Sequence, residues 1–170
     1  MYYFDILKAL HESGTDYLLV GGLAVNLYGA PRVTQDMDLV LAMRKDNILK
    51  FNRVLEELGY VPRLPVNPDD LADEAVRDLW IREKNMKAFS YCHSRNNYRV
   101  IDVVLLYNTD YETLKRGATV KKAAGVDIHL VGIDDLIEMK RFSGRAQDLS
   151  DVAILEKIKS FTDGEMDREG

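Results

Sequence analysis

Apolar residues recur along the chain with two spacings, which together predict a mixture of helices and strands. A spacing of three to four residues predicts helices at 3–11, 46–58 and 133–140, and a further one from 145 after a break at Ser143-Gly144. Short apolar runs predict strands at 16–20, 37–41 and 128–131. This mixed order of helices and strands indicates the α+β class.

The middle of the chain predicts a β-hairpin. Its arms are 86–92 and 98–106, and the polar run 94–97 forms the turn. Pro62, Pro65 and Pro68 predict an irregular connection before the hairpin. Short helices are expected at 68–76 and 111–116.

Composition fits one compact domain. Hydrophobic residues make up 46% of the 170, enough for a core within 1–161, and the polar, acidic segment 162–170 is predicted to be a flexible tail. Cys92 is the only cysteine, which excludes an internal disulfide and favours the reducing cytoplasm. No apolar run approaches the roughly 18 residues that span a bilayer, so no membrane association is expected. The formal net charge of −5 provides no overall basic field for a nucleic-acid backbone.

Two aspartates, Asp36 and Asp38, lie one residue apart where an apolar strand begins. Side chains alternate across a strand, so both carboxylates point to the same side, roughly 6–7 Å apart. Like charges this close favour a bound cation or proton, and Mg²⁺ prefers oxygen ligands. The alternative is a turn followed by a solvated residue, which explains most isolated Asp-x-Asp pairs.

A glycine pair, Gly21-Gly22, lies upstream between a predicted strand and a short helix that ends at Gly29. Glycine lets the backbone approach a ligand closely, and a helix start offers N–H groups to phosphate. Arg32 and Thr34 follow, and the arginine side chain can donate to phosphate oxygens. A tight turn without a ligand is the alternative interpretation.

The combined motif resembles the core of the DNA polymerase beta-type nucleotidyltransferase superfamily. Its order, Gly21-Gly22, then Arg32-x-Thr34-x-Asp36-x-Asp38, is most similar to the bacterial branch of AbiEii-type and minimal nucleotidyltransferases. The resemblance implies a polymerase beta-like palm, which is a mixed β-sheet with helices packed against it. It implies a catalytic core at about 17–106 and C-terminal helices at about 133–161. Gly22 departs from the serine that much of the superfamily has there.

The same resemblance requires a third carboxylate on a neighbouring strand. Asp102 is the only acid in the apolar second arm of the predicted hairpin, and an unpaired charge in a central strand is costly. Without the upstream motif, an edge position or a pairing with Arg99 would explain it. With the motif present, Asp102 is the expected third member.

The resemblance also implies a ligand set and a reaction. Asp36, Asp38 and Asp102 would be the catalytic residues and the ligands of two Mg²⁺ ions, with Mn²⁺ as the alternative ion. Gly21, Gly22, Arg32, Thr34 and Lys140 would bind the nucleotide. The reaction would move a nucleoside monophosphate from an NTP to an acceptor hydroxyl and release pyrophosphate.

The C-terminal third contains the order Lys140, Gly144-Arg145, Asp148 and Asp151, which is similar to an element of the same bacterial branch. There the lysine would reach the triphosphate. Acids in the first turn of a helix also complement the helix dipole, so an ordinary structural role is the alternative. Arg145 and Asp148 are expected to brace the two helices.

The acceptor is open at this level. A protein hydroxyl, a tRNA end or a small molecule would each fit, and the acidic net charge disfavours tRNA. One hypothesis is a toxin–antitoxin or phage-defence enzyme with a cognate partner. The alternatives are an antibiotic-modifying enzyme of the lincosamide or aminoglycoside type, and a non-catalytic, antitoxin-like module of the same fold.

Overall fold

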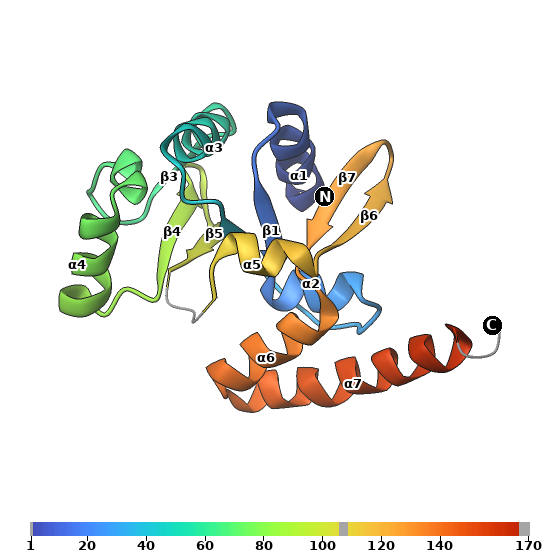
Figure 1. The fold of residues 1–170 in the computed structure, drawn as a ribbon. Helices are drawn as coiled ribbons and strands as arrows, with labels where there is room; N and C mark the ends of the chain where they lie inside the picture. The colour runs from blue at the N-terminus through green and yellow to red at the C-terminus, as the bar shows by residue number, and fades with distance from the viewer. Residues whose placement is uncertain (1, 106–108, 167–170) are drawn as a thin grey trace.

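A seven-stranded mixed β-sheet forms the centre of the molecule, as seen in the computed structural model, which describes residues 2–105 and 109–166 (Figure 1). The strand order across the sheet is β3-β4-β5-β2-β1-β7-β6. The strands are β1 (Tyr17–Val20), β2 (Asp36–Leu41), β3 (Tyr60–Pro62), β4 (Ala88–His93), β5 (Asn96–Val104), β6 (Thr119–Ala123) and β7 (Val126–Leu130). The α-helices are α1 (Tyr2–Ser13), α2 (Gly21–Leu27), α3 (Lys45–Glu57), α4 (Glu74–Lys84), α5 (Tyr111–Arg116), α6 (Ile133–Ser143) and α7 (Ala146–Met166).

The middle of the sheet combines both strand directions. Strand β2 pairs antiparallel with β1 and parallel with β5, and β1 pairs parallel with β7. The pairs β3–β4, β4–β5 and β6–β7 are antiparallel. The predicted α+β class with a mixed sheet is therefore confirmed.

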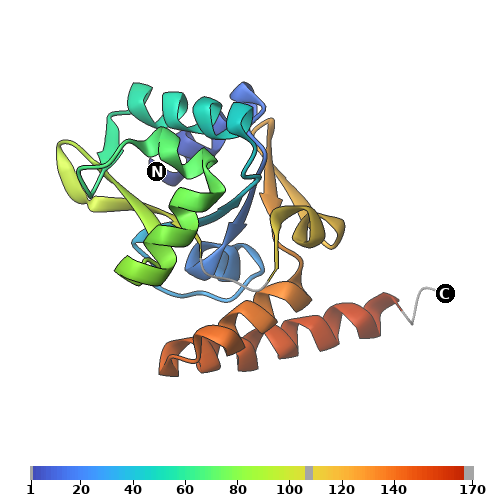
Figure 2. The same cartoon turned by 60° about the vertical axis from the view of Figure 1, so that its left-hand side comes forward.

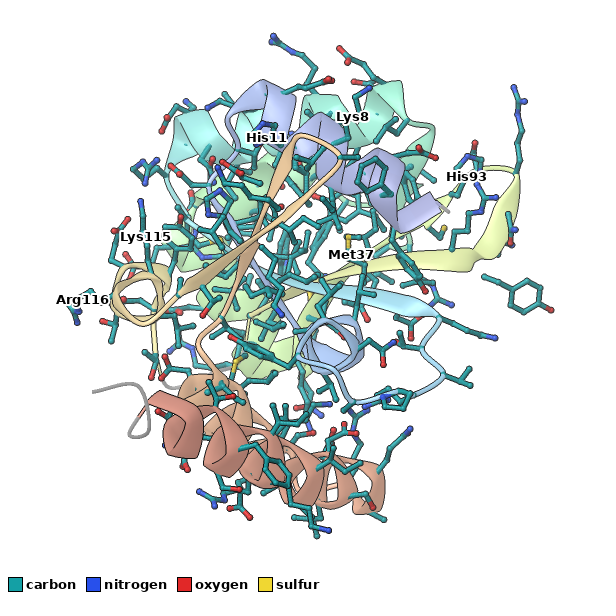
Figure 3. The ribbon with its side chains drawn as sticks, turned by 90° about the vertical axis from the view of Figure 1, so that its right-hand side faces the viewer. Lys8, His11, Met37, His93, Lys115 and Arg116 are labelled. Atoms are coloured by element: carbon teal, nitrogen blue, oxygen red, sulfur yellow. The ribbon has the colours of Figure 1, made fainter. Side chains whose placement is uncertain are left out.

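Helices cover the two faces of the sheet unequally. Helices α1, α3 and α4 lie on one side, and α2, α6 and α7 lie on the other, with α7 alongside α6 (Figures 1 and 2). Met37, which separates the two aspartates in sequence, is fully buried and points to the side of α1 (Figure 3). Strand alternation therefore directs Asp36 and Asp38 to the opposite side, which α2 and α6 only partly cover.

Two short edge strands were not predicted. The proline-rich connection contains β3, in which Pro62 is tolerated because the strand lies at the sheet edge. The other edge strand, β6, joins β7 through the turn Ala124-Gly125, and its mostly exposed residues lack the apolar alternation that marks a strand. Edge strands carry few buried side chains, so their sequence pattern is weak.

The remaining differences concern element boundaries. The helix predicted at 68–76 is a 3₁₀ turn at Pro68–Ala72 followed by the longer α4, whose N-cap Asp73 accepts from the backbone N–H of Ala75 and Val76. The hairpin turn is the two residues between β4 and β5, not four, and Leu106 lies outside the described residues. Helix α7 continues to Met166, into the segment predicted as tail, because extending an existing helix is far easier than nucleating one. Among the described residues, no helix combines the length and the apolar character needed to cross a membrane.

Candidate functional site

Asp38 and Asp102 lie directly opposite each other on neighbouring strands. Strand β2 runs parallel to β5, and the register pairs Asp38 with Asp102 and Asp36 with Val100. The structure therefore places Asp102 on the strand next to that of Asp38, and its role as the third carboxylate stays a prediction. Asp36 shares the same face two residues earlier, and its side chain is exposed.

The electrostatics of this pair disfavour two negative charges. Burial raises the pKa of Asp38 to about 6, and Asp102 and Asp36 add to the rise while Lys140 and Arg145 oppose it. Burial also raises the pKa of Asp102, although a hydrogen bond from Ser90 opposes the rise. Within the described residues, the buried Oδ1 of Asp102 has no hydrogen-bond partner. The pair is therefore suited to hold a proton or a cation.

The glycine pair lies directly against these groups. Gly21 has a φ of +64°, and a Cβ built on it would come within 1.9 Å of the Asp38 Oδ2 atom. A Cβ on Gly22 would lie 2.8 Å from the Thr34 Oγ1 and 3.1 Å from the Arg32 Cζ. Any side chain at these two positions would displace the aspartate or the Arg32-Thr34 segment. The structural reason for Gly21-Gly22 is thus space at the site itself.

Comparison with solved structures identifies the architecture. The chain superposes on the lincosamide antibiotic adenylyltransferase LnuA, bound to lincomycin, with a TM-score of 0.60 and 17% identity, over 92% of this chain and 95% of LnuA. For ANT(2'')-Ia in complex with adenylyl-2''-tobramycin, the TM-score is 0.57 and the identity 13%, over 99% and 97% of the two chains. An antigenic nucleotidyltransferase-like protein from Paracoccidioides brasiliensis gives a TM-score of 0.51 at 15% identity, over 89% and 72%.

The chain has the nucleotidyltransferase fold. No protein-family model matches it, and no curated protein matches it in sequence. Identities this low establish the fold and leave the activity to be argued from the site.

The nucleotidyltransferase fold typically uses Mg²⁺, and the chemistry of the Asp38–Asp102 pair fits such an ion. Carboxylate oxygens are the ligands that Mg²⁺ prefers, and the unpartnered Oδ1 of Asp102 is one of them. Among residues 2–105 and 109–166, however, no group of three or more His, Cys, Asp or Glu side chains is gathered closely enough to hold a metal. A site with all three carboxylates would require the exposed Asp36 side chain to turn toward the pair.

Two cations predicted to bind the nucleotide have carboxylate partners in this structure. Lys140 is 5% exposed, and its ammonium lies 2.8 Å from the Asp148 Oδ1 and 2.9 Å from the Asp151 Oδ2. Arg32 forms an ion pair with the same Asp151 oxygen, and the Arg145 Nε donates to the Asp148 Oδ2 at 2.7 Å. Three positive and two negative groups leave this cluster with a charge of +1. It ties the segment after α2 to both C-terminal helices, as expected for Arg145 and Asp148.

The positive cluster borders a cavity of about 540 Å³ beside the aspartates. Its lining includes Gly21, Asp38, Lys87, Lys140 and Arg145. Arg145 keeps 76% of its side chain exposed although it contacts Asp148. The cavity therefore presents cationic groups next to the carboxylate pair, which suits a polyphosphate carrying a divalent ion.

Sequence reasoning missed Ser90 and Lys87 as members of the site. Ser90 lies opposite Asp102 on β4 and hydrogen-bonds to it, and Lys87 lines the cavity just before the same strand. The pairing of Ser90 with Asp102 depends on an irregular register at Cys92 and His93. A symmetric four-residue turn would have placed Phe89 there instead, so the sequence carried no clear signal for Ser90.

A Gly21→Ala variant is expected to lose nucleotide binding and at least about 1–2 kcal/mol of stability, the cost of the left-handed conformation for alanine. The added Cβ would also displace the Asp38 carboxylate. Urea unfolding and calorimetric titration with NTP would measure the two effects. Gly14→Ala is the matched control, because Gly14 has the same φ of +64° and open space around its Cβ position. Equal behaviour of the two variants would contradict a role for the Gly21–Asp38 approach.

Proposed function

We propose that this protein is a magnesium-dependent nucleotidyltransferase that moves a nucleoside monophosphate from an NTP to an acceptor hydroxyl and releases pyrophosphate. The observation that carries the proposal is the placement of Asp38 opposite Asp102 and against Gly21. Two partly buried like charges, one with an unpartnered oxygen, are costly in the free protein, and such perturbed carboxylates cluster at functional sites. The shared fold of LnuA and ANT(2'')-Ia supports the same reaction class.

Each residue then has a role set by its place. Asp36 and Asp38 would hold the Mg²⁺ ion on the triphosphate side, and Asp102 would hold the second Mg²⁺ ion on the acceptor side. Bound Mg²⁺ would supply charge neutralisation at the phosphate and at the attacking oxygen. Gly21 and Gly22 allow phosphate to approach the backbone, with Thr34 beside them. Most of the catalytic effect in phosphoryl transfer comes from such positioning and charge stabilisation.

The cations of the site fall into two groups, those exposed to the cavity and those held by aspartates. Lys87 and Arg145 line the cavity and are exposed, so they can contact phosphate oxygens directly. Lys140 also lines the cavity, but its ammonium is held by two aspartates, and Arg32 is held by one of them. In this proposal Lys140 and Arg32 contribute positive potential and rigidity, and Lys140 contacts a phosphate only if it exchanges a partner.

A small-molecule acceptor is favoured by the extent of the structural match. LnuA is bound to lincomycin and ANT(2'')-Ia holds adenylyl-2''-tobramycin, and this chain covers 95% and 97% of those two chains. An antibiotic-modifying role is therefore the second candidate. A toxin–antitoxin or phage-defence role of the AbiEii type, acting on a protein or a tRNA, and a non-catalytic binding module stay predictions from the sequence.

Calorimetric titration with each NTP, with and without Mg²⁺, would test the proposal. We expect magnesium-dependent binding that disappears in the Asp36→Asn/Asp38→Asn double variant and persists in Asp5→Asn, an exposed carboxylate on α1. The NTP that binds would identify the nucleobase of the donor nucleotide. Absence of binding to all four NTPs would contradict the proposal and favour the non-catalytic module.

A further inference from the structure

A second, smaller cavity lies beside β4 and is bordered by Ser90, which hydrogen-bonds to Asp102. It has a volume of about 220 Å³ and is lined by Arg63, Leu64, Met86, Ala88, Phe89 and Ser90. The first cavity also reaches Ala88, so the two cavities share this residue of β4. Ligand pockets for drug-sized molecules span about 300–1,000 Å³, so this one fits only part of a larger ligand.

The position of this cavity is fixed by strand register. Asp38, Asp102 and Ser90 lie opposite one another on three neighbouring strands. The Arg63 backbone N–H donates to the Ser90 carbonyl at 2.9 Å, which places Arg63 next in the same row. Ser90 thus links the lining of the cavity to Asp102, the carboxylate on the acceptor side.

The lining has a distinct chemical character. Four of its six residues are apolar, and Leu64 exposes 48% of its surface although it is aliphatic. Of the six, only Arg63 carries a charge, whereas the first cavity combines Asp38 with several cations. An apolar wall with one guanidinium favours an apolar group attached to an anion, and it repels a cation.

We propose that this cavity is the acceptor subsite, and that it selects a small hydroxyl compound with an apolar ring-sized part and an anionic group over a cationic one. This inference rests on the proposed nucleotidyl transfer, since Asp102 defines the acceptor side. Leu64 and Met86 would contact the apolar part, Arg63 would pair with the anion, and the hydroxyl would lie toward Asp102.

A matched pair of probes tests this preference. The compounds 3-(4-hydroxyphenyl)propionate and tyramine share the ring and the hydroxyl and differ in the sign of their charge. We expect the propionate to shift the methyl NMR resonances of Leu64 and Met86 in the 170-residue protein. Its affinity should exceed that of tyramine by about tenfold or more, as expected for exchanging repulsion for attraction near one guanidinium.

Variants assign the preference to Arg63. Arg63→Ala should reduce the ratio of the affinity for the propionate to that for tyramine to about one. Arg63→Lys should retain most of the preference for the propionate. Arg53→Ala on α3, an exposed arginine of the helix that packs on the opposite face of the sheet, should leave it unchanged. Equal affinities for the two probes, resonance shifts confined to other residues, or a preference that survives Arg63→Ala would overturn the proposal.

Nucleotide titration of the same samples separates the two proposals. Probe binding that fails while Mg²⁺–NTP still binds would overturn the acceptor subsite alone. Probe binding that succeeds while no NTP binds would overturn nucleotidyl transfer, and with it the assignment of the cavity to an acceptor.

Discussion

Replacing Asp38 with asparagine is expected to stabilise the protein at pH 8 and to abolish nucleotide transfer. The two effects have one origin, because the buried, like-charged surroundings that raise the pKa of Asp38 to about 6 are relieved by a bound cation. Loss of a metal ligand removes several kcal/mol of transition-state stabilisation, so transfer should fall on the order of 10³-fold or more.

The stability gain should depend on pH in a defined direction. An aspartate in the unfolded chain has a pKa of about 3.9, so between about pH 4 and pH 6 the folded state binds more protons than the unfolded state. Wild-type stability therefore falls as pH rises through this window, and above pH 6 the full cost of about 2–3 kcal/mol is present. Asparagine carries no charge, so the variant escapes this cost at pH 8 and gains little at pH 4.

Urea unfolding at pH 4, 6 and 8 with a chelator present would measure this difference. The chelator matters because a bound divalent ion would relieve the repulsion that the experiment detects. Asp5→Asn, which removes an exposed carboxylate from α1, should leave the pH dependence of the wild type unchanged. If Asp38→Asn is less stable than the wild type at pH 8, the interpretation that the charged Asp38 destabilises the free protein is wrong.

Replacing Lys140 with alanine is expected to destabilise the fold by about 3 kcal/mol, the lower end of the range for breaking a buried ion pair. The ammonium lies between Asp148 and Asp151, which are 1% and 4% exposed. Burial alone would raise the pKa of Asp148, but hydrogen bonds from Arg145 and Lys140 hold it well below its usual range. Each aspartate keeps one arginine after the substitution, which limits the loss.

Denaturant unfolding at pH 7 would measure this change, with Lys159→Ala as the control. Lys159 pairs with Asp134 on the exposed faces of the same two helices, so its loss should change stability by less than about 1 kcal/mol. A loss below about 1 kcal/mol in Lys140→Ala, together with weaker NTP binding, would instead indicate that the ammonium is available to phosphate.

Local sequence patterns predicted much of the site because they depend on short-range geometry. Two-residue alternation placed Asp36 and Asp38 on one side of a strand, and the buried Met37 between them confirms it. The glycine pair was predicted to let a ligand approach the backbone, and the structure adds that a side chain at Gly21 would meet the Asp38 carboxylate. The hairpin that carries Asp102 was predicted as well, although its turn was placed too wide.

Local sequence patterns could not predict the contacts between segments that are distant in the chain. Arg32 and Asp151 are separated by 119 residues, and no local pattern indicates that Arg32 pairs with a helix near the C-terminus rather than with phosphate. Lys140 was assigned to the nucleotide on its motif, and only the packing of α6 on α7 shows that its ammonium is held by two buried aspartates.

The sequence by itself determined which side chains share a strand face, that a glycine pair joins a strand to a helix, and that two like charges lie close together. The tertiary structure alone decided that Asp102 lies opposite Asp38, that Ser90 and Arg63 continue the same row, and that a second cavity opens there. The physical reason is that side-chain alternation is set within two residues of the chain, whereas strand register and desolvation are set by the packing of the whole domain.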